Sequence, residues 1–166
     1  PQKPDVSFEE TQVDTLPFCH LHTHTQFSVL QSTISIPKLV QEAASMKMPA
    51  VAITDIGNLM GAFHFVEAVN KHNKSLEEIS GNPIKPIIGI TLYVCANHLD
   101  RSHRDDGFQI VLIAKNKNGY HNLAKLTSIA HTKGFYYVPR VDRELILNYK
   151  EDIIVLTGNM SFHFLE

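Results

Sequence analysis

Three histidines alternate with other residues near the start of the chain, in the segment Cys19–Thr25. If this segment is a β-strand, His20, His22 and His24 point to the same face, because side chains in a strand alternate between its two faces. Neutral imidazole is a common ligand of zinc and related divalent ions, so the pattern indicates a metal site. A row of hydrogen-bonded polar residues lining a cavity would have the same spacing, and the spacing alone leaves both interpretations open.

A carboxylate follows a second apolar run, in the sequence Val51–Asn58. Asp55 comes where this run ends, and a glycine turn at Gly57 leads from it toward a helix. An aspartate or asparagine in such a turn commonly caps the helix, and Asn58 is placed to do the same. We therefore expect Asp55 to cap the helix or to support metal ligands from behind, rather than to bind a metal directly.

The aromatic run Phe135–Tyr137, followed by Pro139 and Arg140, is a third feature with potential chemistry. Its rings could stack on a nucleic-acid base or on a partner protein. Because aromatic side chains stabilise proteins mainly through burial, packing beneath a loop is the favoured interpretation. We find no phosphate-binding loop, dinucleotide fingerprint or nucleophile elbow in the sequence.

Short apolar runs alternate along the chain with segments of helical period, which predicts an α/β fold. Ser35 is placed to cap the first helix, and Gly134 to follow the end of the third. The expected strands are Phe18–Thr25, Val51–Asp55, Pro86–Ala96, Phe108–Ala114 and Asp152–Thr157. The expected helices cover residues 36–44, 59–69 and 120–130, and a short one follows Asp142.

Continuous apolar strands such as Val51–Ile53 and Ile110–Ile113 are typical of a parallel sheet covered by helices. About five strand–helix units of this kind are compatible with a doubly wound sheet or with part of a βα barrel. In both architectures the functional residues gather at the carboxyl ends of the strands.

Composition narrows the functional classes. The chain has 166 residues, of which 43% are hydrophobic and 19% are charged, and its formal net charge is −2. This length suits one domain, and the charge excludes the broad positive surface of a protein that coats nucleic acid. Two cysteines within apolar runs, and no run long enough to span a bilayer, predict a soluble cytoplasmic protein without membrane contacts.

We expect the acidic residues 1–17 to form a flexible amino-terminal segment ahead of one domain that covers residues 18–166. The chain stops just after a strand-like run, so we expect this domain to be truncated at its carboxyl end.

These motifs resemble the PHP (polymerase and histidinol phosphatase) domain at the amino-terminal end of bacterial DNA polymerase III alpha subunits. The likeness runs from about Phe18 to Asn159. Stand-alone PHP phosphatases share the His-x-His and Thr-Asp-x-Gly motifs but, as a rule, not the later blocks, which favour the polymerase branch. The matching blocks are His20–Leu30, Met48–Asp55, Gly57–Ala62, Ile84–Gly89, Ala114–Asn116, Gly119–Leu123, Gly134–Tyr136 and Pro139–Glu144.

The resemblance implies an irregular (β/α)7 barrel, of which this chain would supply about five βα units. In metal-loaded members of the family the cleft holds up to three divalent ions and hydrolyses phosphoesters. In some replicative polymerases it is a proofreading 3′–5′ exonuclease. His22 and His24 match the paired histidine ligands of the family, with His20 just before them and Asp55 in the second motif.

Most of the other family ligands are changed in this sequence. Gln31 stands where the first motif usually has an aspartate or histidine, and Ile56 replaces the histidine of the Asp-His-Gly turn. Thr91 and Gln109 take the places of a glutamate and of a histidine that opens the fourth strand. Asn159 replaces a cysteine or histidine, and the last ligands, an Asp-x-His pair, would follow residue 166.

A cluster of divalent ions needs anionic ligands, and none of the replacement residues supplies one. We therefore expect no tightly bound cofactor. The vestigial site would hold zinc or manganese weakly through His22 and His24, with His20 and Asp55 as additional contacts. Without a tightly held metal, the hydrolytic mechanism loses both its nucleophile and its charge stabilisation.

The leading hypothesis is a PHP domain of a DNA polymerase III alpha subunit with a degenerate metal site and a mainly structural role, inactive as a fragment. DNA synthesis would then reside elsewhere in the parent chain. The expected partners are the remainder of the alpha subunit, DNA reached through the parent chain, and other replisome subunits. One alternative is an active phosphoesterase or 3′–5′ exonuclease with ligands completed outside this chain. Another is a binding module that accepts a phosphate or a partner segment through the three histidines.

Overall fold

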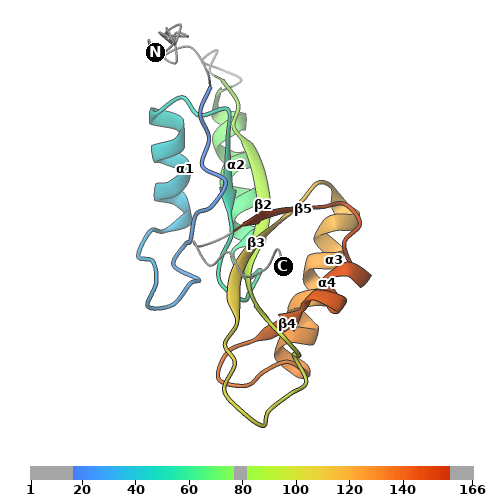
Figure 1. Ribbon diagram of the computed structural model, residues 1–166. Helices are drawn as coiled ribbons and strands as arrows, with labels where there is room; N and C mark the ends of the chain where they lie inside the picture. The colour runs from blue at the N-terminus through green and yellow to red at the C-terminus, as the bar shows by residue number, and fades with distance from the viewer. Residues whose placement is uncertain (1–16, 77–81, 158–166) are drawn as a thin grey trace, which may run out of the picture.

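The computed structural model describes residues 17–76 and 82–157 of the chain (Figure 1). The elements are α1 (Ile36–Ser45), β1 (Ala50–Ile53), α2 (Ala62–Leu76), β2 (Lys85–Cys95), β3 (Phe108–Ala114), α3 (Lys117–Thr132), β4 (Arg140–Asp142), α4 (Arg143–Asn148) and β5 (Ile153–Thr157). Their order confirms the α/β class. No helix within the described ranges is long and apolar enough to cross a membrane.

The strands form an open, mixed sheet centred on β2. β1 and β4 pair in parallel with the first and last residues of β2, whereas β3 pairs with β2 in the antiparallel direction. β5 adds to β3, also antiparallel. The expectation of a parallel sheet is therefore wrong for β3 and β5. The five strands of the described residues form an open sheet, and the partial barrel that the resemblance implies stays a prediction.

Two hydrophobic cores pack on this sheet at opposite ends of the molecule (Figure 1). One lies among α1, α2 and β1 and is centred on residues such as Leu39 and Phe65. The other lies among α3, α4 and strands β2 to β5 and includes Leu112 and Leu126. β2 runs from one end to the other, so it fixes the position of the first core relative to the second.

The expected helix ends at Ser35 and Gly134 are confirmed in position. α1 begins directly after Ser35, although the Ser35 hydroxyl makes no capping hydrogen bond. α3 ends at Thr132, and the N–H of Gly134 donates to the carbonyl of Ile129 at 3.1 Å, which satisfies one of the free carbonyls at the helix end.

Residues 17–24 run beside β1 without forming a strand, which corrects the expected strand Phe18–Thr25. The N–H of Ala52 donates to the carbonyl of His20 at 2.9 Å, and that of Thr54 to the carbonyl of Thr23 at 2.8 Å. His20 and Thr23 are three residues apart, whereas their partners Ala52 and Thr54 are two residues apart, so the segment contains one extra residue. The segment bends at residues 21–22 to absorb the extra residue, so its side chains do not alternate regularly between two faces.

Candidate functional site

His22, His24 and Thr91 bring three polar atoms together and form what we call the histidine site. The two imidazole Nε2 atoms lie 3.1 Å apart. The hydroxyl oxygen of Thr91, on the central strand β2, lies 3.4 Å from each of them. The Thr91 hydroxyl donates its own proton to the carbonyl of Thr54 at 2.8 Å, so it faces the imidazoles as an acceptor.

A hydrogen bond between the two imidazoles needs one ring as the donor and the other as the acceptor. One ring must carry a proton on Nε2 and the other must leave its Nε2 free to accept it. Burial lowers the pKa of His24, and neighbouring His22 lowers it further, against an opposite influence of Asp55. The lowered pKa favours the neutral form of the His24 ring.

His20 does not join the other two histidines, which corrects the expected row of three imidazoles. Its ring packs edge-on against Phe18, with ring centroids 4.9 Å apart. It shares with His22 only the lining of an apolar cavity of about 370 Å³ beside α1. The reason is the extra residue in the segment 17–24, which breaks the alternation on which the expectation depended.

Asp55 is buried and its carboxylate is occupied by donors from the loop that follows the histidines. It accepts hydrogen bonds from the backbone N–H of Thr25 at 2.6 Å, from the Thr25 hydroxyl at 2.7 Å and from the Ser28 hydroxyl at 2.6 Å. The carboxylate therefore ties residues 25–28 to the end of β1 and sets the position of His24. It caps no helix, because α2 begins only at Ala62.

Replacing Asp55 with asparagine is expected to reduce the free energy of unfolding by about 2–4 kcal/mol, because a buried carboxylate with three donors would become a neutral amide. Chemical denaturation of the two proteins measures this loss. Asp106→Asn, at a surface loop, is the matched control and should leave stability nearly unchanged. A loss for Asp55→Asn no larger than that of the control would contradict the role of Asp55 as an anchor.

Asn58 is likewise not the helix cap that its place suggested. Its amide donates to the carbonyls of Phe27 and Ile56 at 3.1 and 3.0 Å, and its side-chain oxygen accepts from the N–H of Met60 at 3.1 Å. Asn58 and Asp55 together hold the loop of residues 25–28 against the turn that follows β1.

The positions where the resemblance predicts replaced metal ligands lie in different parts of the structure. Ile56 forms an isolated bridge with Thr91, so its backbone borders the histidine site. Gln109 pairs with Tyr93 in the sheet register, which places it on the same sheet face as Thr91. Gln31 is exposed in the loop before α1. Asn159 lies outside the described residues.

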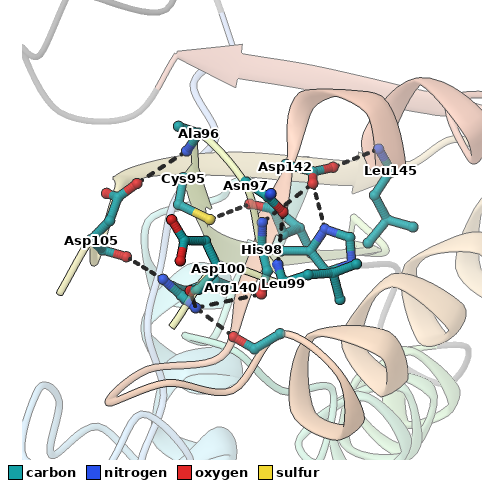
Figure 2. Close-up of polar contacts among 12 residues, drawn as sticks. Cys95, Ala96, Asn97, His98, Leu99, Asp100, Asp105, Arg140, Asp142 and Leu145 are labelled. Carbon is teal, nitrogen blue, oxygen red and sulfur yellow. Dashed lines mark hydrogen bonds and ion pairs between the residues drawn. The ribbon is translucent and has the colours of Figure 1, made fainter. Parts of the chain in front are cut away.

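A second polar cluster joins β4 to the loop between β2 and β3 (Figure 2). Arg140 is completely buried and donates to the carbonyls of Gly134, His98, Asp100 and Asp105, at distances from 2.7 to 3.4 Å. The ring of His98 pairs with the carboxylate of Asp142, two residues farther along β4. We call Arg140, Asp142 and His98 the loop clamp, because together they fasten residues 96–107 to β4.

The pKa of Asp142 makes the stability that the loop clamp contributes depend on pH. Burial acts to raise the pKa of Asp142, but hydrogen bonds from the His98 ring and from the N–H groups of Leu145 and His98 outweigh it and lower the pKa. A carboxyl with a lowered folded-state pKa stabilises the fold above its unfolded-state pKa of about 3.9. This contribution is lost as the pH falls through the folded-state pKa.

We expect Asp142→Asn to make the free energy of unfolding decrease less steeply with falling pH below about pH 4. Denaturant unfolding across a pH series measures this slope. An acid limb as steep as that of the unmodified chain would contradict this assignment.

Sequence reasoning missed the donors around Asp55 and the whole loop clamp. A Thr25-x-x-Ser28 spacing directly after the histidines was the available signal for the donors. Nothing in the sequence marks Arg140 as buried, because arginine is usually exposed. The favoured packing of the aromatic run beneath a loop is wrong for Phe135 and Tyr137, which are 49% and 60% exposed.

The family model described as the PHP domain matches residues 20–165, which include the histidine site and the loop clamp. The chain belongs to the PHP domain family.

The relatives of this PHP domain include DNA polymerase III alpha subunits. Those of Chlamydia trachomatis and Treponema pallidum are each 39% identical to it, over 85% and 87% of this chain. That of Aquifex aeolicus is 38% identical over 85% of this chain. The domain spans only 11% or 12% of the length of these relatives and is homologous to their amino-terminal region. A crystal structure from Bifidobacterium adolescentis, described as a candidate metal-dependent phosphoesterase, aligns with a TM-score of 0.37 and 21% identity over 68% of this chain and 34% of its own.

The divalent ions that the resemblance implies can be compared with the geometry of the histidine site. Its three atoms are 3.1 to 3.4 Å apart, close to the ~3.3 Å between ligand atoms around a tetrahedral ion with bonds of ~2.0–2.1 Å. That spacing suits one ion. The donors do not suit a cluster of ions, because two neutral imidazoles and a hydroxyl carry no charge. In the described part of the chain, no three His, Cys, Asp or Glu side chains are grouped to hold a metal.

Proposed function

We propose that this PHP domain is the amino-terminal part of a replicative DNA polymerase III alpha subunit, in which it has a mainly structural role and a degenerate metal site. The observation that carries the proposal is the histidine site itself. A neutral threonine hydroxyl lies 3.4 Å from the Nε2 atom of each imidazole, at the position where the resemblance places a glutamate. The nearby carboxylate of Asp55 is occupied by three donors.

The chemistry of hydrolysis explains why this donor set favours a structural role. Metal-dependent phosphoester cleavage uses bound ions to lower the pKa of a water molecule and to neutralise charge on the phosphoryl oxygens. Uncharged ligands offset little of the charge of several divalent ions, so ions at this site would be few and weakly held. What the site's residues do support is local structure, since Thr91, Thr54 and Asp55 link β2, β1 and the preceding loop by hydrogen bonds.

The proposed partners follow from the relatives rather than from contacts in this chain. The remainder of an alpha subunit is the first, because the homologous region in the relatives belongs to a much longer polymerase chain. DNA would be reached through that parent chain, and other replisome subunits would be reached in the same way.

Metal titration tests the degenerate site. Isothermal titration of the 166-residue chain with manganese or zinc should give weak binding of at most one ion per chain, and His24→Ala should remove it. Tight binding of two or more ions would contradict the proposal.

The alternative function is a metal-dependent phosphoesterase or 3′–5′ exonuclease with ligands completed outside this chain. The spacing of the three atoms in the histidine site, which suits a tetrahedral ion, is the observation in its favour. Single-stranded DNA with a labelled 3′ end separates the two functions. With a full-length domain that includes the ligands expected after residue 166, manganese-dependent trimming that disappears in His22→Ala would support the nuclease, whereas intact DNA would support the structural role.

A further inference from the structure

The turn that follows β1 holds the backbone of Thr91, the residue on β2 that contacts both imidazoles of the histidine site. The N–H of Thr91 donates to the carbonyl of Asp55 at 3.0 Å, and the N–H of Gly57 donates to the carbonyl of Thr91 at 2.8 Å. Ile56, between these two partners, forms the isolated bridge with Thr91. The position of the Thr91 hydroxyl relative to the imidazoles therefore depends on the position of this turn.

Gly57 is the residue of the turn whose backbone conformation requires glycine. Its φ of 69° lies in the left-handed region, which residues with a side chain adopt only at a cost in energy. A Cβ atom at this position would also lie 2.9 Å from the Cγ atom of Pro139, which is closer than a non-bonded carbon approaches. The loop between α3 and β4 therefore packs directly against the turn that holds Thr91.

His131, on α3, contacts the same turn from the side opposite to β2. Its Nε2 atom lies 2.8 Å from the carbonyl oxygen of Gly57. A carbonyl oxygen can only accept a hydrogen bond, so Nε2 carries the proton and donates it. Gly57 is thus bound at both backbone groups, through its N–H to β2 and through its carbonyl to α3.

This pair of hydrogen bonds connects the two hydrophobic cores beside the histidine site. β1, which leads into the turn, packs in the core formed with α1 and α2. α3, which carries His131, packs in the other core through residues such as Leu126 and Ala130. A displacement of the end of α3 would therefore act on the turn, and through the turn on Thr91.

The residues that follow α3 hold the His131 ring in its orientation. Phe135 stacks on this ring with centroids 6.3 Å apart and an angle of 21° between the planes. Arg140 donates to the carbonyl of Gly134 at 3.2 Å, which fixes the backbone directly before Phe135. Phe135 is 49% exposed, so its ring does not belong to a core, and its contact with His131 restricts the rotation of the imidazole.

We propose that His131 is a positioning residue of the histidine site. Acting through the carbonyl of Gly57, it fixes the backbone of Thr91 and with it the hydroxyl that lies 3.4 Å from each imidazole. His131 is not itself a metal ligand at this site, because the nitrogen that faces the turn carries a proton and has no free lone pair. The inference rests on the site named in the proposed function, but on its geometry alone and not on whether an ion binds.

Two-dimensional NMR of the histidine rings, recorded on the metal-free 166-residue chain, tests this proposal. We expect His131→Ala to shift the ring nitrogen signals of His22 and His24, because their contact with Thr91 changes when the turn is released. The amides of Gly57 and Thr91 should exchange with solvent about 2- to 12-fold faster, the usual effect of losing one hydrogen bond.

A conservative variant separates positioning from packing. His131→Gln should keep the ring signals and the amide exchange close to those of the unmodified chain, because the glutamine amide can donate to the same carbonyl. His121→Ala removes another exposed histidine of α3 and is the matched control, so it should change neither measurement. Thermal unfolding shows whether each variant retains its fold. If His131→Ala does not fold, Phe135→Leu, which removes the stacked ring but keeps the hydrogen-bonding group, should shift the same ring signals by a smaller amount.

Three results would overturn the proposal. Unchanged signals of His22 and His24 in a folded His131→Ala would show that the site keeps its geometry without this hydrogen bond. Equal shifts in His131→Gln and His131→Ala would show that the imidazole acts by packing and not by donating. Unchanged signals in Phe135→Leu, where that variant replaces an unfolded His131→Ala, would show that the ring orientation does not affect the site. Because these spectra are recorded without metal, none of the three alters the outcome of the metal titration.

Discussion

Replacing Arg140 with methionine is expected to lower the free energy of unfolding by roughly 3–5 kcal/mol, because several hydrogen bonds from a charged group, each of about 1.5–3 kcal/mol, would be lost. Arg140 is completely buried and donates to four backbone carbonyls in two separate loops. Methionine keeps most of the side-chain volume but donates no hydrogen bond, so the carbonyls would be left buried without donors or would draw water into the core. Denaturant unfolding of both proteins measures the difference.

The location of the damage distinguishes the loop clamp from a general packing defect. Backbone amides in residues 96–107 should exchange with solvent much faster in Arg140→Met, while those in α1 and α2, which belong to the other core, should change little. Arg143→Met is the matched control, because Arg143 is exposed at the start of α4, and it should leave stability and exchange nearly unchanged. A loss of less than about 1 kcal/mol for Arg140→Met would show that the loop is held by other contacts.

Local sequence patterns are enough to predict the helix boundaries of this fold. Helix α1 was predictable because Ile36, Leu39, Val40 and Ala43 repeat with helical period, and all four are buried. The carboxyl end of α3 was predictable from Gly134 for the same kind of local reason. These features depend on neighbours in the sequence, so no knowledge of the rest of the fold is needed.

The direction of β3 was misjudged although the sequence contained the information. A parallel connection between neighbouring strands needs a crossover, usually a helix, and no helical period lies between residues 96 and 107. The loop between β2 and β3 therefore had to make an antiparallel pair. The burial of Arg140, in contrast, could not be predicted from the sequence. Its partners are backbone carbonyls in distant loops, and no pattern of side chains indicates them.

Only part of the histidine site could be predicted from the sequence, because the rest depends on how backbone segments pair. The pair His22 and His24 converges as their spacing indicated, but His20 does not, because the extra residue against β1 is visible only in the pairing of backbones. Thr91 entered the prediction solely through the resemblance to the family. Only the sheet register and the contact of its hydroxyl with both imidazoles place it at the centre of the site.

That central place makes Thr91 the position at which metal binding should be easiest to restore. We expect Thr91→Glu combined with Ile56→His to tighten the binding of zinc or manganese by roughly two orders of magnitude, because the site would gain one anionic ligand and one imidazole. Isothermal titration gives the affinity. Thr91→Gln combined with Ile56→His is the matched control, because glutamine has the size of glutamate without its charge. Equal affinities in the two double variants would contradict the argument that lost charge explains weak binding.

Stability provides a second measurement of the same effect. Thr91 is fully buried, so a glutamate there would be desolvated and the metal-free double variant should unfold at a lower temperature than the unmodified chain. A metal ion that binds only the folded state would reverse the loss, by about 2.7 kcal/mol at a hundredfold excess over Kd. The glutamate variant should therefore melt below the glutamine control without metal and above it with metal. This crossing requires that the charge at residue 91 meets a bound ion, and a variant that merely packs badly would remain less stable under both conditions.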